Sequence, residues 1–151
     1  MGRAQKLWKK GRGKLGVLDP LMGAWQAEAE SPMGPVRCTR TFTRVLGGSH
    51  VQLTALWEYA DTAYEELALI GPGPDGQLHF WSFTSGGKQS QGQLADVTDI
   101  HAEAVGFEAH MPAGLARMAY WPDEEAGFHW AVEAKTKTGW KRFTQHHYTP
   151  L

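Results

Sequence analysis

The chain has 151 residues, a formal net charge of −1 and 42% hydrophobic residues. A chain of this length can bury about two-thirds of its unfolded surface, so we expect one core that needs no disulfide or metal. Its single cysteine, Cys38, excludes an internal disulfide, and no apolar run approaches the roughly 20 residues of a membrane-spanning helix. We therefore expect a soluble, cytoplasmic protein.

Basic residues are concentrated in the first 14 positions, which contain no acidic residue. Gly11, Gly13 and Gly16 disfavour a stable helix there. The sequence therefore predicts a flexible basic leader over residues 1–18, followed by a single domain over residues 19–151. The alternative is an arm that touches anionic lipid or nucleic acid, although we expect no nucleic-acid partner. The basic residues of this segment are Arg3, Lys6, Lys9, Lys10, Arg12 and Lys14.

From Asp19 onward, turn signals recur at short intervals and separate about ten segments of strand length. Apart from a short turn at residues 20–22, no segment indicates a helix, and no parallel strand–helix–strand pattern appears. The first strand opens with Gly23-Ala24-Trp25, and small ligand-binding barrels often begin with such a G-x-W. The glycine allows a tight turn, and the tryptophan plugs the closed end. These features predict an all-β, antiparallel, up-and-down barrel of about ten strands.

Alternation along these segments separates two faces of each strand. Trp57 and Tyr59 lie on the apolar face of residues 51–59, and Trp130 lies on that of residues 128–134. Tyr120 follows the same alternation in residues 115–121. Aromatic rings with a polar tip suit the wall of a ligand cavity, because each tip needs a partner. The alternative is that these four residues simply fill the barrel.

Arg40 lies on the apolar face that Val36, Cys38 and Phe42 share. A guanidinium stays charged, so it needs a carboxylate, a ligand anion or an exit to water. Arg40 is therefore a candidate anchor for the acidic head group of a ligand. The alternatives are an internal ion pair or a side chain that reaches water at the barrel rim, and the nearby Arg44 is compatible with the latter.

The last segment, residues 140–148, places His146 and His147 on opposite faces, so the two cannot bind one metal ion together. His146 is a second candidate for the polar contact of a ligand. The sequence contains no metal-ligand cluster, and we expect no metal site. Paired carboxylates and a nucleophile–base pair are also missing, so we assign no catalytic residue and favour a binding protein over an enzyme.

Five blocks of the sequence resemble, in the same order, the uncharacterised bacterial family known as domain of unknown function 1579. The resemblance covers about Asp19 to Tyr148, with departures at Ser49 and at Pro72-Gly73, where it implies a reshaped rim. It implies a calycin-like barrel, similar to lipocalins and fatty-acid-binding proteins, but no established activity. The blocks are Gly23-Ala24-Trp25, Met33-Gly34-Pro35-Val36, Thr39-Arg40-Thr41-Phe42, Val45-Leu46-Gly47-Gly48 and Leu67-Ala68-Leu69-Ile70-Gly71.

Calycin barrels often lay an arginine of the last strand over the G-x-W tryptophan, and this resemblance assigns Arg142 to Trp25 as a cation–π closure of the barrel. The chain also resembles, more distantly, the nitrobindin barrels, which hold haem through a histidine of the last strand. His146 or His147 occupies a comparable place, so haem is an alternative to the expectation of no cofactor.

The sequence therefore predicts a barrel that binds a small, largely apolar or amphipathic molecule with an acidic or polar head group. A haem protein is one alternative. An enzyme that acts on a ligand inside the barrel is another, with His146, Tyr120 or Tyr59 as acid or base. A homodimer is left open. The residues assigned to ligand binding are Arg40, Trp57, Tyr59, Tyr120, Trp130 and His146.

Overall fold

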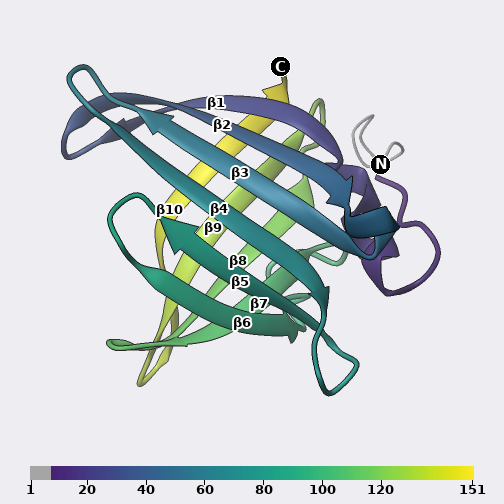
Figure 1. The fold of residues 1–151 in the computed structure, drawn as a ribbon. Coiled ribbons are helices and arrows are strands. Elements are labelled where there is room, and N and C mark those ends of the chain that lie inside the picture. The colour runs from purple at the N-terminus through teal and green to yellow at the C-terminus, as the bar shows by residue number, and fades with distance from the viewer. Residues whose placement is uncertain (1–7) are drawn as a thin grey trace.

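A computed structural model describes residues 8–151 of the chain, and these residues form a closed barrel of ten antiparallel strands (Figure 1). Each strand pairs with its neighbours in the chain, and the last strand returns to the first. This confirms the predicted all-β, up-and-down barrel. The strands are β1 (Gly23–Ser31), β2 (Gly34–Val45), β3 (His50–Glu58), β4 (Ala63–Pro72), β5 (Leu78–Thr84), β6 (Gln89–Ala95), β7 (Val105–Met111), β8 (Gly114–Pro122), β9 (Phe128–Thr136) and β10 (Gly139–Pro150).

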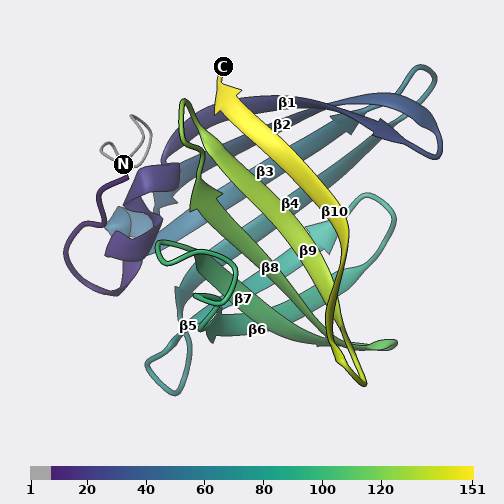
Figure 2. The same ribbon diagram turned by 180° about the vertical axis from the view of Figure 1, so that it is seen from behind.

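One end of the barrel is covered by the 3₁₀ helix η1 (Lys14–Leu21), as Figures 1 and 2 show. Leu18 and Leu21 are fully buried, and Leu15 is also part of the core. Gly23, with a φ of 113°, then turns the chain into β1 through the left-handed region that favours glycine. The expected boundary between leader and domain at residue 18 therefore needs correction. It falls inside η1, whose leucines belong to the barrel core, while residues 1–7 lie outside the described part.

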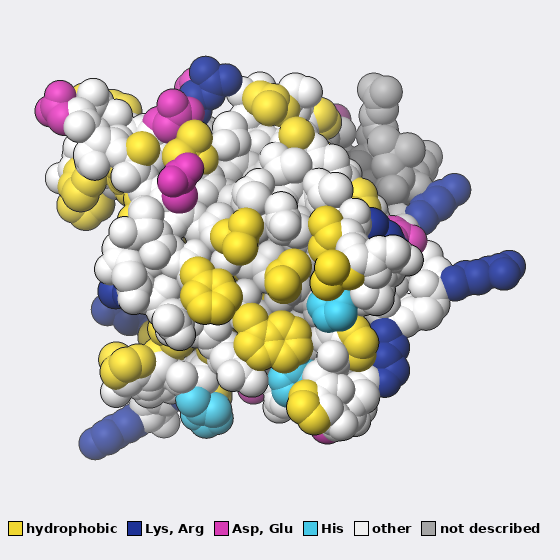
Figure 3. Space-filling view, viewed as in Figure 1, with side chains coloured by type: hydrophobic (Ala, Val, Ile, Leu, Met, Phe, Trp, Pro, Cys, Tyr) yellow, Lys and Arg dark blue, Asp and Glu magenta, His cyan; other side chains and the backbone are white. Residues whose placement is uncertain are grey.

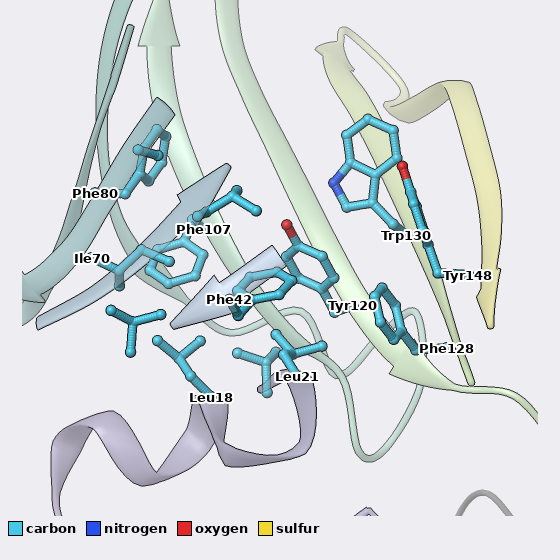
Figure 4. Packing of buried hydrophobic residues seen from close by; sticks show 14 of the residues in the cluster. Leu18, Leu21, Phe42, Ile70, Phe80, Phe107, Tyr120, Phe128, Trp130 and Tyr148 are labelled. Carbon is cyan, nitrogen blue, oxygen red and sulfur yellow. The ribbon is translucent and has the colours of Figure 1, made fainter. Parts of the chain in front are cut away.

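Aromatic and aliphatic side chains fill the half of the barrel next to η1 (Figure 4). Leu18 and Leu21 come from η1, and the rings of Phe42, Tyr120 and Phe128 lie beside them. The ring centroid of Tyr120 lies 5.7 Å from that of Phe42 and 5.6 Å from that of Phe128, and both pairs are arranged edge to face. This half of the interior is a packed core. For Tyr120, the alternative that the aromatic residues simply fill the barrel therefore holds.

The outer surface of β3, β4 and β5 also carries apolar side chains, which gather near the centre of the face in Figure 3. Leu67 and Phe83 are directly opposite each other on β4 and β5, and Leu67 is 44% exposed. Around Leu67 and Phe83 both faces of β4 and β5 are apolar, so alternation does not distinguish the inner face from the outer one there.

A short outer cluster covers β8 and β9 on the opposite side of the molecule. Val97 and Ala104, from the segment between β6 and β7, pack against Ala119, Trp121 and Ala131.

None of the helices within residues 8–151 is long and apolar enough to cross a bilayer.

Candidate functional site

The half of the barrel opposite η1 contains a cavity of about 290 Å³. Its lining includes Thr84 and Met111, which end β5 and β7 at the turns farthest from η1. The cavity therefore lies toward the end of the barrel that no helix of residues 8–151 covers. Most of its walls are apolar or aromatic, and three charged residues also line it. Arg40 from β2 and Glu66 from β4 form an ion pair, and Arg117 from β8 is paired with Asp99 and Glu133. The main apolar lining residues are Trp57, Phe80, Phe107, Met118, Trp130 and Val132.

Arg40 is the most unusual residue of this cavity, because its side chain is only 1% exposed. Its Nη2 lies 3.7 Å from Oε1 of Glu66, which is an ion pair but is longer than a hydrogen bond. Its guanidinium carbon lies 4.3 Å from the centroid of the Trp130 ring and 5.7 Å from that of Trp57. The rings of Tyr120 and Tyr148 are also near, each at 5.8 Å. The charge of Arg40 is therefore held mainly by aromatic faces.

Four buried polar atoms around Arg40 have no hydrogen-bond partner within residues 8–151. They are Nε and Nη1 of Arg40, the hydroxyl oxygen of Tyr120 and Nε1 of Trp130. Buried polar groups in folded proteins nearly always have a partner, because an unpaired one costs about 1–3 kcal/mol. All four can donate a hydrogen bond, so this part of the interior is suited to a group that accepts them.

Glu66 is positioned by a neighbour on the next strand. Ser82 of β5 donates a hydrogen bond from Oγ to Oε2 of Glu66 at 2.5 Å, and the Glu66 side chain is 21% exposed. Our sequence reasoning did not find Glu66, although it lies on the same face of β4 as the buried Ala68 and Ile70. A carboxylate on an apolar face was the available signal. It was obscured because Leu67 makes the outer face of β4 look equally apolar.

A second hollow, of about 640 Å³, opens along the seam between β1 and β10. These strands pair only at Trp25 with Pro150 and at Gln26 with Thr149, next to a bond from the Leu151 N–H to the Ala24 carbonyl oxygen. Beyond that point the two strands diverge, as Figure 2 shows. The seam hollow is lined by residues from both strand edges and by Trp57 and Trp130, which also line the inner cavity. The two tryptophans therefore stand between the hollows, with ring centroids 6.5 Å apart.

His146 lies in the seam hollow, and its ring centroid is 5.2 Å from that of Trp130. Its Nδ1 lies 3.4 Å from the hydroxyl of Tyr148. Burial, together with the nearby positive charge of Arg40, lowers the pKa of His146 to about 4, so its imidazole is neutral at pH 7. His147 points to the outer face, where it contacts the Ala126 carbonyl oxygen and stacks on His129.

The six residues that the sequence assigned to ligand binding are thus divided between three places. Arg40, Trp57 and Trp130 line the inner cavity together. Tyr59 and His146 line the seam hollow, where they meet the same two tryptophans. Tyr120 belongs to the packed half, and its ring centroid lies 5.8 Å from the guanidinium carbon of Arg40. The structure also shows that an internal ion pair, one of the alternatives for Arg40, is present.

The expected contact between Arg142 and Trp25 is wrong. The register of β10 against β9 shifts between Arg142 and Thr144, so the extra residue at this bulge reverses the alternation. Arg142 consequently lies on the outside, where its guanidinium carbon is 5.1 Å from the Trp121 ring and Nε donates to Oε2 of Glu133 at 2.9 Å. Trp25 pairs with Pro150, eight residues and about 26 Å farther along β10.

Trp25 closes the covered end of the barrel by other contacts. Its Nε1 donates to the Leu21 carbonyl oxygen at 2.7 Å, and its ring packs edge to face against Phe128 at 4.8 Å. The plug predicted for Trp25 is therefore built with η1 rather than with an arginine.

Two further side chains limit the chemistry that this interior can perform at neutral pH. Burial raises the pKa of the Cys38 thiol to about 11 and that of the Tyr120 hydroxyl to about 12, so both stay protonated. No group of three or more histidine, cysteine, aspartate or glutamate side chains in residues 8–151 is arranged to hold a metal ion. The arrangement is therefore one of hydrogen-bond donors, one carboxylate and aromatic walls, which can orient a bound molecule.

Comparison with known proteins found no family model that matches the chain and no curated protein sequence similar to it. The resemblances described above therefore stay predictions.

Proposed function

We propose that the protein binds a small, largely apolar molecule in the open half of the barrel, with a polar head group held at Arg40. The observation that carries this proposal is the state of Arg40. Its guanidinium is almost completely buried, lines the cavity, and leaves Nε and Nη1 without an acceptor in residues 8–151. A ligand acceptor placed there would satisfy donors that residues 8–151 leave unpaired.

The dimensions and lining of the cavity fit a binding role. Its volume of about 290 Å³ is at the lower end of the range of about 300–1,000 Å³ that small-molecule sites occupy. Apolar walls with a few convergent polar groups are the usual composition of such sites. Because Trp57 and Trp130 also line the seam hollow, a longer apolar tail would extend toward β1 and β10. A calycin-like carrier would combine these features.

The alternatives of a haem protein and of an enzyme receive no comparable support. The two candidate bases inside the barrel are poorly matched to proton transfer near pH 7, because the pKa of His146 is lowered to about 4 and that of Tyr120 is raised to about 12. Binding is therefore the function that these contacts favour.

A fluorescence titration tests the proposal, because Trp57 and Trp130 line the cavity. The probes are octanamide, octan-1-ol and octanoic acid, which combine one apolar chain with three head groups. We expect saturable binding of at least one probe and a loss of roughly tenfold or more in affinity for Arg40→Met. Arg44→Met is the matched control, since Arg44 is an exposed arginine of the same strand that pairs with Asp19.

Circular dichroism and urea unfolding establish that each variant is folded before its affinity is compared with that of the parent protein. The proposal is overturned if none of the three probes saturates the folded parent protein. It is also overturned if Arg40→Met binds the probes as tightly as the parent protein does.

A further inference from the structure

We propose that the site selects a neutral head group that both accepts and donates hydrogen bonds, such as a carboxamide, and that Glu66 is the residue that determines this specificity. This inference rests on the proposed binding function and names the chemical class of the ligand. Its basis is the position of a carboxylate directly beside the arginine that would hold the head group.

The two charged groups leave part of their hydrogen-bonding capacity unused. The separation of 3.7 Å between Nη2 of Arg40 and Oε1 of Glu66 exceeds hydrogen-bond distance, so the ion pair does not consume a donor or an acceptor. Nε and Nη1 of Arg40 have no partner in residues 8–151. Glu66 is held in place through its other oxygen, Oε2, by Ser82. The cavity wall therefore presents donors and an acceptor side by side.

The net charge of the pair argues against an anionic head group. Arg40 and Glu66 cancel each other, so a carboxylate that approaches Arg40 also approaches the negative charge of Glu66. Such like-charge contacts are a common means of excluding the wrong ligand. The other cation that lines the cavity, Arg117, is paired with the carboxylates of Asp99 and Glu133, and His146 beyond Trp130 is neutral at pH 7.

A carboxamide matches both members of the pair. Its carbonyl oxygen accepts from the free N–H groups of Arg40, and its amino group donates to the carboxylate of Glu66. An alcohol has one oxygen for both tasks, and an ester lacks the donor. An analogue that lacks one of these groups leaves a buried polar group of the site unpaired. Sites of this kind therefore discriminate strongly against such an analogue. The carboxamide is therefore expected to bind more tightly than either analogue.

The test compares octanamide with octanoic acid by isothermal titration at pH 7.5, where the acid is ionised. We expect the parent protein to bind the amide at least roughly tenfold more tightly than the acid. Glu66→Gln removes the negative charge, keeps the shape and frees Arg40, so the acid should gain roughly tenfold or more in affinity. Glu66→Asp retains the charge and should keep the preference for the amide.

Glu65→Gln is the matched control, because Glu65 is the preceding residue of β4, lies on its outer face and is exposed. It should leave the ratio of the two affinities unchanged. The inference is overturned if the parent protein binds the acid as tightly as the amide, or if Glu66→Gln does not change the ratio. Binding of both probes without preference contradicts this inference alone, whereas the proposed function is also contradicted only if octan-1-ol fails to bind together with the amide and the acid.

Discussion

The guanidinium carbon of Arg40 lies 4.3 Å from the centroid of the Trp130 ring, in the interior of the barrel. Among residues 8–151, Glu66 is the only carboxylate that forms an ion pair with this arginine. Moving the charge of Arg40 out of water carries a desolvation cost, which the ion pair with Glu66 and the aromatic faces oppose. A buried charge whose hydrogen-bond donors are unpaired contributes little to the stability of a fold. This relationship therefore supports the proposal that Arg40 serves a binding site more than the fold.

Replacement of both charged residues by apolar ones should leave the barrel stable. We expect the double variant Arg40→Met/Glu66→Leu to have a free energy of unfolding within about 1 kcal/mol of the parent value, or above it. The reason is that no charge is then left buried without its partner. Urea unfolding measures the difference, and the same variant should fail to bind the octanamide probe. A loss of about 3–5 kcal/mol would instead assign a structural role to the pair.

The helix η1 should contribute strongly to stability, since Leu18 is fully buried among the rings of the covered end. Truncation of a buried leucine to alanine costs about 2–5 kcal/mol, so Leu18→Ala should shift the urea midpoint markedly. Leu67→Ala provides the control, because Leu67 is 44% exposed on the outer face of β4 and its truncation should change stability far less. Equal effects of the two substitutions would show that η1 is not part of the core.

The stability of the fold should depend on pH through His146. The folded chain holds the pKa of His146 at about 4, compared with about 6.5 for an ordinary histidine. As the pH falls from 7 to 5, the unfolded chain binds a proton at this position that the folded chain does not, so the free energy of unfolding decreases. The contribution at pH 5 is at most about 2 kcal/mol, at 1.4 kcal/mol per pKa unit.

His146→Gln should therefore flatten the pH dependence of the unfolding free energy between pH 7 and pH 5. The other histidines are common to both proteins and cancel in the comparison. Paired urea titrations at the two pH values give the difference. Identical slopes for the parent protein and the variant would contradict the partly buried, neutral state of His146.

The seam between β1 and β10 should be the most readily opened part of the barrel. Strands β2 and β3 pair continuously from Arg37 to Val45, whereas β1 and β10 pair at only two positions. Amides of residues 27–31 and 139–147 that face the seam should therefore exchange with solvent much faster than those of β3. Hydrogen exchange followed by NMR measures this, and protection equal to that of β3 would show that the barrel is closed along its whole length.

The sequence was sufficient for the barrel because strand alternation and turn residues are local signals that agree with the global fold. It was insufficient where tertiary contacts decide. The leucines of η1 become core residues only because the barrel end is open to receive them, and glycines around them gave no helical pattern. The bulge at Phe143 reverses the alternation of β10. Uninterrupted alternation therefore predicts the wrong face for Arg142. Glu66 was missed because Leu67 makes the outer face of β4 as apolar as the inner one, so the sequence does not show which face points inward.

The most direct test uses the tryptophans as reporters of where a ligand binds. Trp57 and Trp130 line the inner cavity, whereas Trp121 packs in the outer cluster and Trp140 lies over Arg117. In a titration with octanamide, the indole N–H signals of Trp57 and Trp130 should shift saturably in the NMR spectrum, and those of Trp121 and Trp140 should stay in place. Saturable shifts of the outer pair alone, or no saturable shift of the inner pair, would contradict binding inside the barrel.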